Sequence, residues 1–406
     1  MKKLLGSGAR TLGGFLLLAS TAWAEDAQTW RYFAADAADN PYPSRACITN
    51  GTTWALAVDV VDADARTLRI ACAGTAANAY LTDPASAPTL DLRGTVFGAD
   101  ETETYTITKI AQRALGGDAA KGTATAVVTP GTLTGDFEAW FAGFQVDADG
   151  ASIDECFADY TSITVDEPNL TGKLKEKLIP RTKETLRWTL RVPKATRIDS
   201  WALAAARNGS IADQAGTFTA DSFLSVTDIG GNGMSNRKYD GVLHLPVVES
   251  IGSYGVSGTD PGYFDIQLGA ETRSVKNLPV GCCGWMTNPT NLVLGLAADN
   301  TVGKEAFTSF PRLRRVEFTG YPPNFTEDAV NVFTGPGIDS ITFIVPPSAA
   351  WAAYLAPFAA SGDFIRWSGD QIRAWRAEHP EGPVVIGTVN GTVFKSDTRH
   401  YLAVSD

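Results

Sequence analysis

The chain has 406 residues, of which 45 are acidic and 34 are basic, so its formal net charge is −11. This balance argues against nucleic acid as a partner, because binding to phosphates requires clustered lysine and arginine. The length is sufficient for a large core or for one long array of repeats. The class of protein therefore has to come from the pattern of residues along the chain.

The first 24 residues have the composition of a secretory signal peptide. A basic start precedes a short apolar run over residues 12–19, and "AWA" at 22–24 fits the small-x-small cleavage rule. We expect cleavage before Glu25 and a mature protein that is secreted or held at the cell surface. An uncleaved anchor is the less favoured alternative, because the run is too short to span a bilayer. We expect no transmembrane segment in the mature chain.

Residues 25–89 are predicted to form a β-rich N-terminal segment. The stretch "WALAVDVVDADARTLRIACAG" (54–74) alternates apolar and polar residues on both sides of "DADA", which is typical of a hairpin. "DLRGTV" and "ETYTITKI" continue the strand character. Cys47 and Cys72 flank the hairpin and are a candidate disulfide in an exported protein. Trp30, Trp54 and Trp188 lie in predicted strands, where core packing is the default.

A short motif recurs along the chain. It consists of an aliphatic or aromatic anchor, a small residue four positions later and an apolar residue five positions later. From Ile198 onward the anchors lie 22 to 31 residues apart, in the range of stacked repeats. Pro279 is the odd choice at the small position. The seven copies are Ile110/Ala114/Leu115, Ile198/Ala202/Leu203, Ile229/Gly233/Met234, Ile251/Gly255/Val256, Val275/Pro279/Val280, Val302/Ala306/Phe307 and Phe325/Ala329/Val330.

An apolar-x-apolar pair precedes most of these anchors by eight to ten residues. Residues two apart in a strand face the same side, so each pair points into one core. Between residues 110 and 198 the register is weaker, with a pair at Ile163/Val165 and an anchor at Leu174; degenerate repeats and an unrelated β insertion both remain open there. The clear pairs are Leu190/Val192, Leu243/Leu245, Ile266/Leu268, Leu292/Leu294, Val316/Phe318 and Ile341/Phe343.

The two signals together predict an α/β repeat solenoid with a parallel strand ladder. Each unit is one strand, a turn and a short helical or irregular return, and stacked units share a continuous core. Strands stack about 4.8 Å apart, whereas helical returns need roughly 8–10 Å. We therefore expect the outer edge to splay and the array to curve.

The repeats resemble those of the BspA-like leucine-rich-repeat proteins of bacteria. The resemblance is carried by "VTDIGGNGMSN", "VESIGSYGVSG" and "NTVGKEAFTSFPRLRRVEF" (300–318), and "ITFIVPPSAAWAAYLAPF" (341–358) is similar to the closing unit of that family. It covers residues 186–358 well, although several repeats carry Gly or Pro where the family prefers Ala. It implies a curved leucine-rich-repeat array in a surface or secreted protein that binds other proteins, glycans or cells.

The expected organisation follows from these signals. A signal peptide (1–24) and the β-rich segment (25–89) precede degenerate repeats or a β insertion (90–185). The leucine-rich repeats (186–345) come next, and a closing unit with a C-terminal cap (346–406) ends the chain.

Few residues indicate catalysis or metal binding. The three histidines are His244, His379 and His400, and no GxSxG elbow accompanies them. "DADGASIDE" (147–155) departs from a calcium loop in the position of its glycine and lacks the closing glutamate. The cysteine spacing fits no zinc site. We predict no enzyme activity, no metal and no cofactor.

The predicted function is binding or adhesion through the outward face of the strand ladder. Exposed tryptophans can also stack on sugars, and those near turns are Trp285, Trp351 and Trp367. Binding through loops, a secreted β-solenoid carbohydrate-active enzyme and a structural envelope or matrix protein are the alternatives. The partner would be a protein or a glycan. The candidate face consists of Arg191, His244, Gln267, Val293, Glu317 and Thr342.

Overall fold

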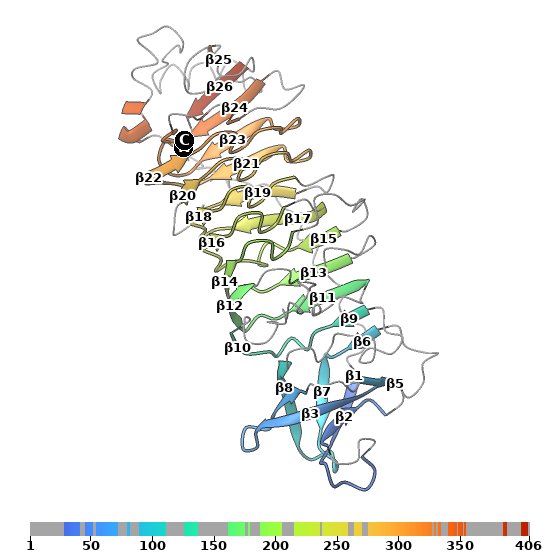
Figure 1. Ribbon diagram of the computed structural model, residues 1–406. Helices are drawn as coiled ribbons and strands as arrows, with labels where there is room; N and C mark the ends of the chain where they lie inside the picture. Colours follow the sequence, from blue (N-terminus) through green and yellow to red (C-terminus); the bar gives the residue numbers. More distant parts are fainter. Residues whose placement is uncertain are drawn as a thin grey trace, which may run out of the picture.

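The chain forms a small barrel followed by a long stack of coils (Figure 1). The structure is a computed structural model, and the residues it describes are 28–40, 45–51, 54–71, 79–81, 89–110, 126–136, 161–174, 178, 187–204, 215–235, 238–258, 264–269, 275–326, 329, 332–333, 340–346, 348–351, 353–354, 385–387 and 399–404. The predicted signal peptide, the "DADGASIDE" stretch and His379 lie outside these residues.

The N-terminal barrel is a closed ring of six strands in the order β2-β1-β7-β8-β4-β3, closed by pairing of β3 with β2, and β5 extends it from β3. The predicted hairpin is confirmed, because β3 and β4 pair antiparallel around residues 62–66. Trp30 and Trp54 fill the core, as expected. The strands are β1 (Gln28–Phe33), β2 (Cys47–Thr49), β3 (Trp54–Asp62), β4 (Thr67–Ile70), β5 (Ala79–Leu81), β7 (Gly94–Phe97) and β8 (Thr104–Ile110).

One flank of the stack is a twelve-stranded sheet, here called the long sheet. Its strands run parallel except for the last pair, β25 with β26. Four of the apolar pairs of the sequence lie in these strands and are buried, namely Leu243/Leu245, Ile266/Leu268, Leu292/Leu294 and Val316/Phe318. In order along the sheet it contains β6 (Thr89–Asp91), β9 (Ala126–Val128), β11 (Ser162–Asp166), β13 (Arg187–Arg191), β15 (Ala215–Phe218), β17 (Lys238–Leu245), β19 (Phe264–Leu268), β21 (Asn291–Leu294), β23 (Arg315–Phe318), β24 (Ser340–Val345), β26 (Arg399–Val404) and β25 (Val385–Gly387).

The opposite flank is a second parallel sheet of seven strands, here called the return sheet (Figure 1). The motif anchors end its strands: Ile198, Ile229 and Ile251 lie side by side in register. Its strands are β10 (Gly135–Asp136), β12 (Leu170–Leu174), β14 (Ala195–Ile198), β16 (Asp228–Ile229), β18 (Ser250–Ile251), β20 (Val275–Leu278) and β22 (Leu296–Val302).

The predicted α/β class, and with it the curved leucine-rich-repeat array, is wrong: the described chain is nearly all β, and its returns are strands. The cause is visible at the turns that follow the return strands. Their amides bond from coil to coil, as in Met234 N to Gly255 O at 2.7 Å and Val256 N to Cys282 O at 2.7 Å. A helix would satisfy these groups internally and would need wider spacing.

The spacing of four and five residues marks a tight corner rather than a helix. In most corner turns the small residue donates its N–H back three residues, as Ala202 does to Asp199 O at 3.1 Å. The residue before it has a φ of +56° to +63°. We call these residues the turn column; they are Trp201, Asn232, Tyr254, Gly281 and Glu305.

Two predicted copies of the motif are placed differently in the structure. Leu278 pairs with Val302, so the fifth copy is Leu278/Cys282/Cys283 and not Val275/Pro279/Val280. Pro279 therefore does not occupy the small position of the motif. That position is held by Cys282 and the apolar position by Cys283, and both cysteines are fully buried. Ile110 belongs to the barrel, where it pairs with Ile70.

Coils continue into the region where the register of the sequence is weak. β11 pairs in parallel with β13, and Leu174 lies beside Ile198 in the return sheet. The core is continuous from the barrel to Trp351. Residues 349–351 and 353–354 are helical. There Trp351 packs on Phe318 with a ring distance of 5.0 Å and donates to Gly320 O at 3.0 Å.

Candidate functional site

The middle of the long sheet carries a row of aligned side chains on its outer face. His244 pairs with Gln267, Gln267 with Val293, and Val293 with Glu317, in successive parallel strands. All four alternate with buried neighbours and are partly exposed. His244 Nδ1 lies 2.9 Å from Ala220 O, so the imidazole is oriented by the preceding coil. We call these four residues the ladder row.

Arg191 and Thr342, predicted for the same row, lie elsewhere on the sheet. Thr342 is level with Arg315, which is two residues before Glu317 and forms an ion pair with it at 2.6 Å. Arg191 lies opposite Asp166, and its guanidinium joins Asp166 at 2.8 Å and Asp221 at 2.6 Å. The hydrogen bond to Asp166, and then that to Asp221, raise the pKa of Arg191 against the effect of partial burial. Arg191 therefore ties coils together.

The most perturbed carboxyl group is Glu167, which sequence reasoning missed. It follows β11 and is fully buried, and its two oxygens accept N–H bonds from Gly131 at 2.8 Å and Leu133 at 2.9 Å. Burial raises its pKa to about 7, against the opposing hydrogen bonds from Thr129 and the two amides. A strongly perturbed acid often marks an active site, but a side chain with no exposed surface cannot touch a substrate. Its contacts fasten the first coils together.

The cysteines give no reactive centre among the described residues. Cys47 is buried and its thiol donates to Asn40 Oδ1 at 3.1 Å. Its proposed disulfide partner Cys72 lies outside the described residues, so that pairing stays a prediction. Burial raises the pKa of Cys282 well above the usual range of a thiol, which makes it a poor nucleophile. Within the described part of the chain no group of His, Cys, Asp and Glu could hold a metal ion.

One of the three tryptophans proposed for sugar stacking is exposed. Trp285 is 38% exposed and stacks on Tyr254, which is equally exposed, with ring centroids 5.6 Å apart. Trp351 is buried, and Trp367 lies outside the described residues. Trp188 is buried in β13, as expected. Tyr254 was not singled out from the sequence; aligning the repeats through Leu278 would have placed it one coil before Gly281 in the turn column.

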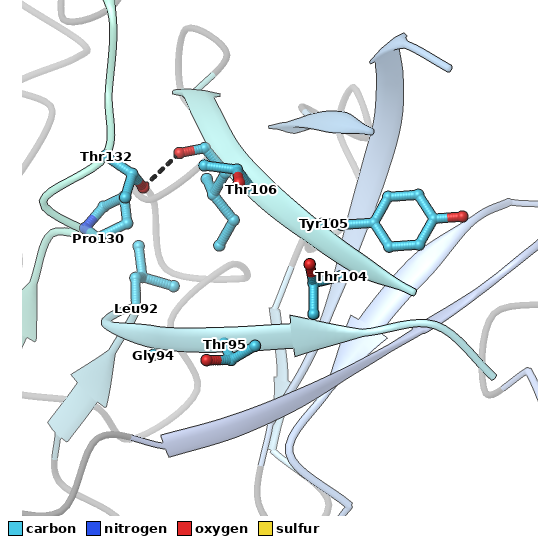
Figure 2. A pocket seen from close by; sticks show the side chains of 9 residues that line it. Leu92, Gly94, Thr95, Thr104, Tyr105, Thr106, Pro130 and Thr132 are labelled. Carbon is cyan, nitrogen blue, oxygen red and sulfur yellow. Dashed lines mark hydrogen bonds between the residues drawn. The ribbon is translucent and has the colours of Figure 1, made fainter. Parts of the chain in front are cut away.

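A small pocket lies where the barrel meets the coils (Figure 2). It has a volume of about 170 Å³, below the several hundred Å³ of ordinary ligand sites. The side chain of Tyr105 points away from the group formed by Leu92, Pro130 and Thr132. Thr132 Oγ1 donates to Ile107 O at 2.6 Å, which fastens the first corner to β8.

None of the described residues that line this pocket is charged. Its polar lining consists of threonines and one tyrosine, so no acid, base or cation converges there. Thr95, Thr104 and Thr106 are exposed, which makes the pocket a shallow depression along β7 and β8. The pocket is therefore a joint between the two parts of the molecule and a weaker candidate site than the ladder row.

Comparisons of the chain with models of protein families, with curated proteins and with solved structures gave no match. Among the described residues, no helix is both long and apolar enough to cross a membrane. The ladder row and the Tyr254–Trp285 pair are the two surfaces of the chain that are best suited to bind a partner.

Proposed function

We propose that this chain is an exported, non-enzymatic binding protein that contacts a protein or glycan partner through the outer face of the long sheet. The observation that carries this proposal is the ladder row, in which an imidazole, an amide, an isopropyl group and a carboxylate lie side by side on four successive coils. Coil-to-coil hydrogen bonds fix their spacing at about 4.8 Å. Side chains held on a rigid sheet lose little entropy on binding.

The chemistry of the same face supports binding over catalysis. Asp166 and Asp221 share one guanidinium, that of Arg191, so neither is poised as a general base. Among the acidic residues that the structure describes, Glu167 has a pKa near neutrality, and it is fully buried. The repeat wording that resembles the BspA-like family supports a surface-binding role, although the chain does not adopt the architecture expected from it.

A binding screen tests the proposal. The mature chain from Glu25 is applied to arrays of glycans and of extracellular-matrix proteins beside the double variant Gln267→Ala/Glu317→Ala. The matched control is Asn277→Ala/Thr301→Ala, an exposed pair on the return sheet whose side chains lie 3.2 Å apart. We expect a ligand that the ladder variant loses and the control keeps. Ligands retained by the ladder variant, or hydrolysed glycans on the array, would overturn the proposal.

A further inference from the structure

The Tyr254–Trp285 pair lies on the corner turns rather than on either sheet. Tyr254 belongs to the turn column, and Trp285 occupies a second position of positive φ four residues after Gly281. The two rings stack across neighbouring coils, with an angle of 30° between their planes. They therefore form one continuous aromatic surface two coils wide.

The backbone at both residues is in a conformation that favours glycine. The φ of Tyr254 is +57° and that of Trp285 is +58°. At the equivalent positions other coils carry Gly281 and Gly258, and also Trp201, Asn232, Glu305 and Ser309, all at positive φ. A bulky residue at positive φ is a rare, strained choice, and such strain gathers at functional sites. Both side chains are more than a third exposed, so part of each ring is open to solvent.

Gly281 makes the stacking possible. A Cβ on Gly281 would lie 2.7 Å from the ring of Trp285 and 2.8 Å from that of Tyr254, closer than atoms can approach. With no side chain there, Trp285 can reach the coil before its own.

The surroundings of the rings select the kind of ligand. The turn column places the amide of Asn232 on the preceding coil and Glu305, 3.9 Å from Lys304, two coils beyond Tyr254. A sugar has an apolar C–H face that stacks on aromatic rings and a rim of hydroxyls for such polar groups. The chain's net charge of −11 disfavours acidic polymers. A protein partner would need a far wider contact surface than two rings.

We propose that the Tyr254–Trp285 pair is a binding site for a neutral glycan, with the two rings stacking on sugar faces and the flanking polar groups bonding to hydroxyls. This inference rests on the proposed binding function and adds both a site and a ligand class to it. The site is separate from the ladder row, so the two can be tested apart.

The test uses glycine substitutions, which suit the backbone of these positions. The mature chain and its Tyr254→Gly and Trp285→Gly variants are titrated with neutral, unbranched hexasaccharides of glucose, mannose, xylose and N-acetylglucosamine. Binding is followed by calorimetry, and stability by unfolding in urea. Arg66→Gly, at a φ of +52° in the barrel hairpin, is the control. We expect at least one hexasaccharide to bind, about tenfold more weakly to each ring variant, with the unfolding midpoint unchanged or raised because strain is released.

Three results would overturn the inference. If no hexasaccharide binds the mature chain, the pair is not a neutral-glycan site, although a protein ligand lost by Gln267→Ala/Glu317→Ala would leave the proposed function intact. If a hexasaccharide binds to both ring variants as tightly as to the unsubstituted mature chain, its binding site does not include the Tyr254–Trp285 pair. If the ring variants unfold more readily than Arg66→Gly, the rings serve packing. Loss of glycan binding in the ring variants alone, with stability kept, supports the site.

Discussion

The barrel and the coils differ in whether their sheets are closed or open. Barrel strand β3 pairs with both β4 and β2, so the ring closes on itself and its pairing is complete. The long and return sheets stay open, and each of their inner strands depends on the coil before and the coil after. The barrel thus fixes almost every strand by closure. Stacking of the coils requires only that each coil presents apolar side chains to the core. The residues at the corners and on the outer faces can therefore differ from one coil to the next.

This difference explains where the candidate binding surfaces lie. Along the ladder row the inward neighbours are uniformly apolar, whereas the outward residues change from imidazole to carboxylate. In the turn column the backbone repeats while the side chain varies from tryptophan to none. Variation on a repeated frame is what a binding surface requires, and both proposed surfaces are found in the coils.

The largest expected effect comes from breaking one coil. Leu292 is fully buried between Ile266 and Val316, so Leu292→Ala should cost about 3 kcal/mol. Because coils depend on their neighbours, we expect amide exchange in residues 264–318 to rise roughly a hundredfold. The barrel, closed by its own pairing, should keep its protection over residues 54–70. Hydrogen exchange with mass spectrometry checks both.

Val293→Ala is the matched control for this prediction. Val293 is the next residue of the same strand but lies on the outer face, so its loss should change exchange little. If Leu292→Ala accelerated amide exchange equally in the barrel, the barrel and the coils would unfold as one unit, and closure would give the barrel no independent stability.

A comparable effect is expected in the first coils, at Glu167. Burial raises the pKa of Glu167 to about 7 from 4.5, so the folded chain favours the protonated form. This stabilisation is fully present below pH 4.5 and is lost as the pH rises to about 7. The free energy of unfolding should therefore fall by up to about 3 kcal/mol across that window. Urea unfolding at several pH values measures the fall.

Glu167→Gln isolates this group from the other carboxyls of the chain. The amide does not titrate, so the difference in stability between the two proteins should depend on pH and level off above about pH 7. A constant difference would mean that Glu167 has an ordinary pKa in the folded protein. Exchange should locate the loosening at residues 126–136, since Gly131 and Leu133 donate to Glu167.

The sequence predicted the repeat but not its class. Apolar alternation identified the strands of the long sheet because a residue such as Leu292 must face the core whatever the return looks like. The spacing from Ile198 to Ala202 and Leu203 fits both a helix and a tight corner, and the repeat pattern alone led us to expect a short helical or irregular return. What decides between them is the hydrogen bonding from coil to coil and the close approach of backbones at Gly252, whose Cβ would lie 2.5 Å from Gly231 N. Those contacts come from different repeats.

Some residues of the candidate sites could likewise be predicted from the sequence, and others could not. His244, Gln267 and Glu317 were predictable as neighbours because their register follows from the apolar pairs beside them. Arg191 and Thr342 lie in other rows because the strands before β17 and after β23 align differently, which composition does not encode. The stacking of Tyr254 on Trp285 depends on a missing side chain at Gly281 and on a positive φ, and neither is readable before the copies are aligned correctly.

The smallest expected effect concerns ion pairs in the two regions. Arg191 joins two carboxylates around its own coil, whereas Arg69 in the barrel joins Asp59 of the same hairpin. Methionine at each position keeps the apolar stem and removes the charge. We expect Arg191→Met to lower the free energy of unfolding by about 1 kcal/mol and Arg69→Met by roughly half as much, since Arg69 is more exposed than Arg191, contacts one carboxylate and not two, and lies on strands already held by closure. Unfolding in urea at low and high salt checks this, because both losses should shrink as salt screens the charges. Equal losses of unfolding free energy for the two substitutions at low salt would mean that the second carboxylate adds nothing to the stability of the Arg191 cluster. The guanidinium of Arg191 would then be as available to bind a ligand as the side chains of the ladder row.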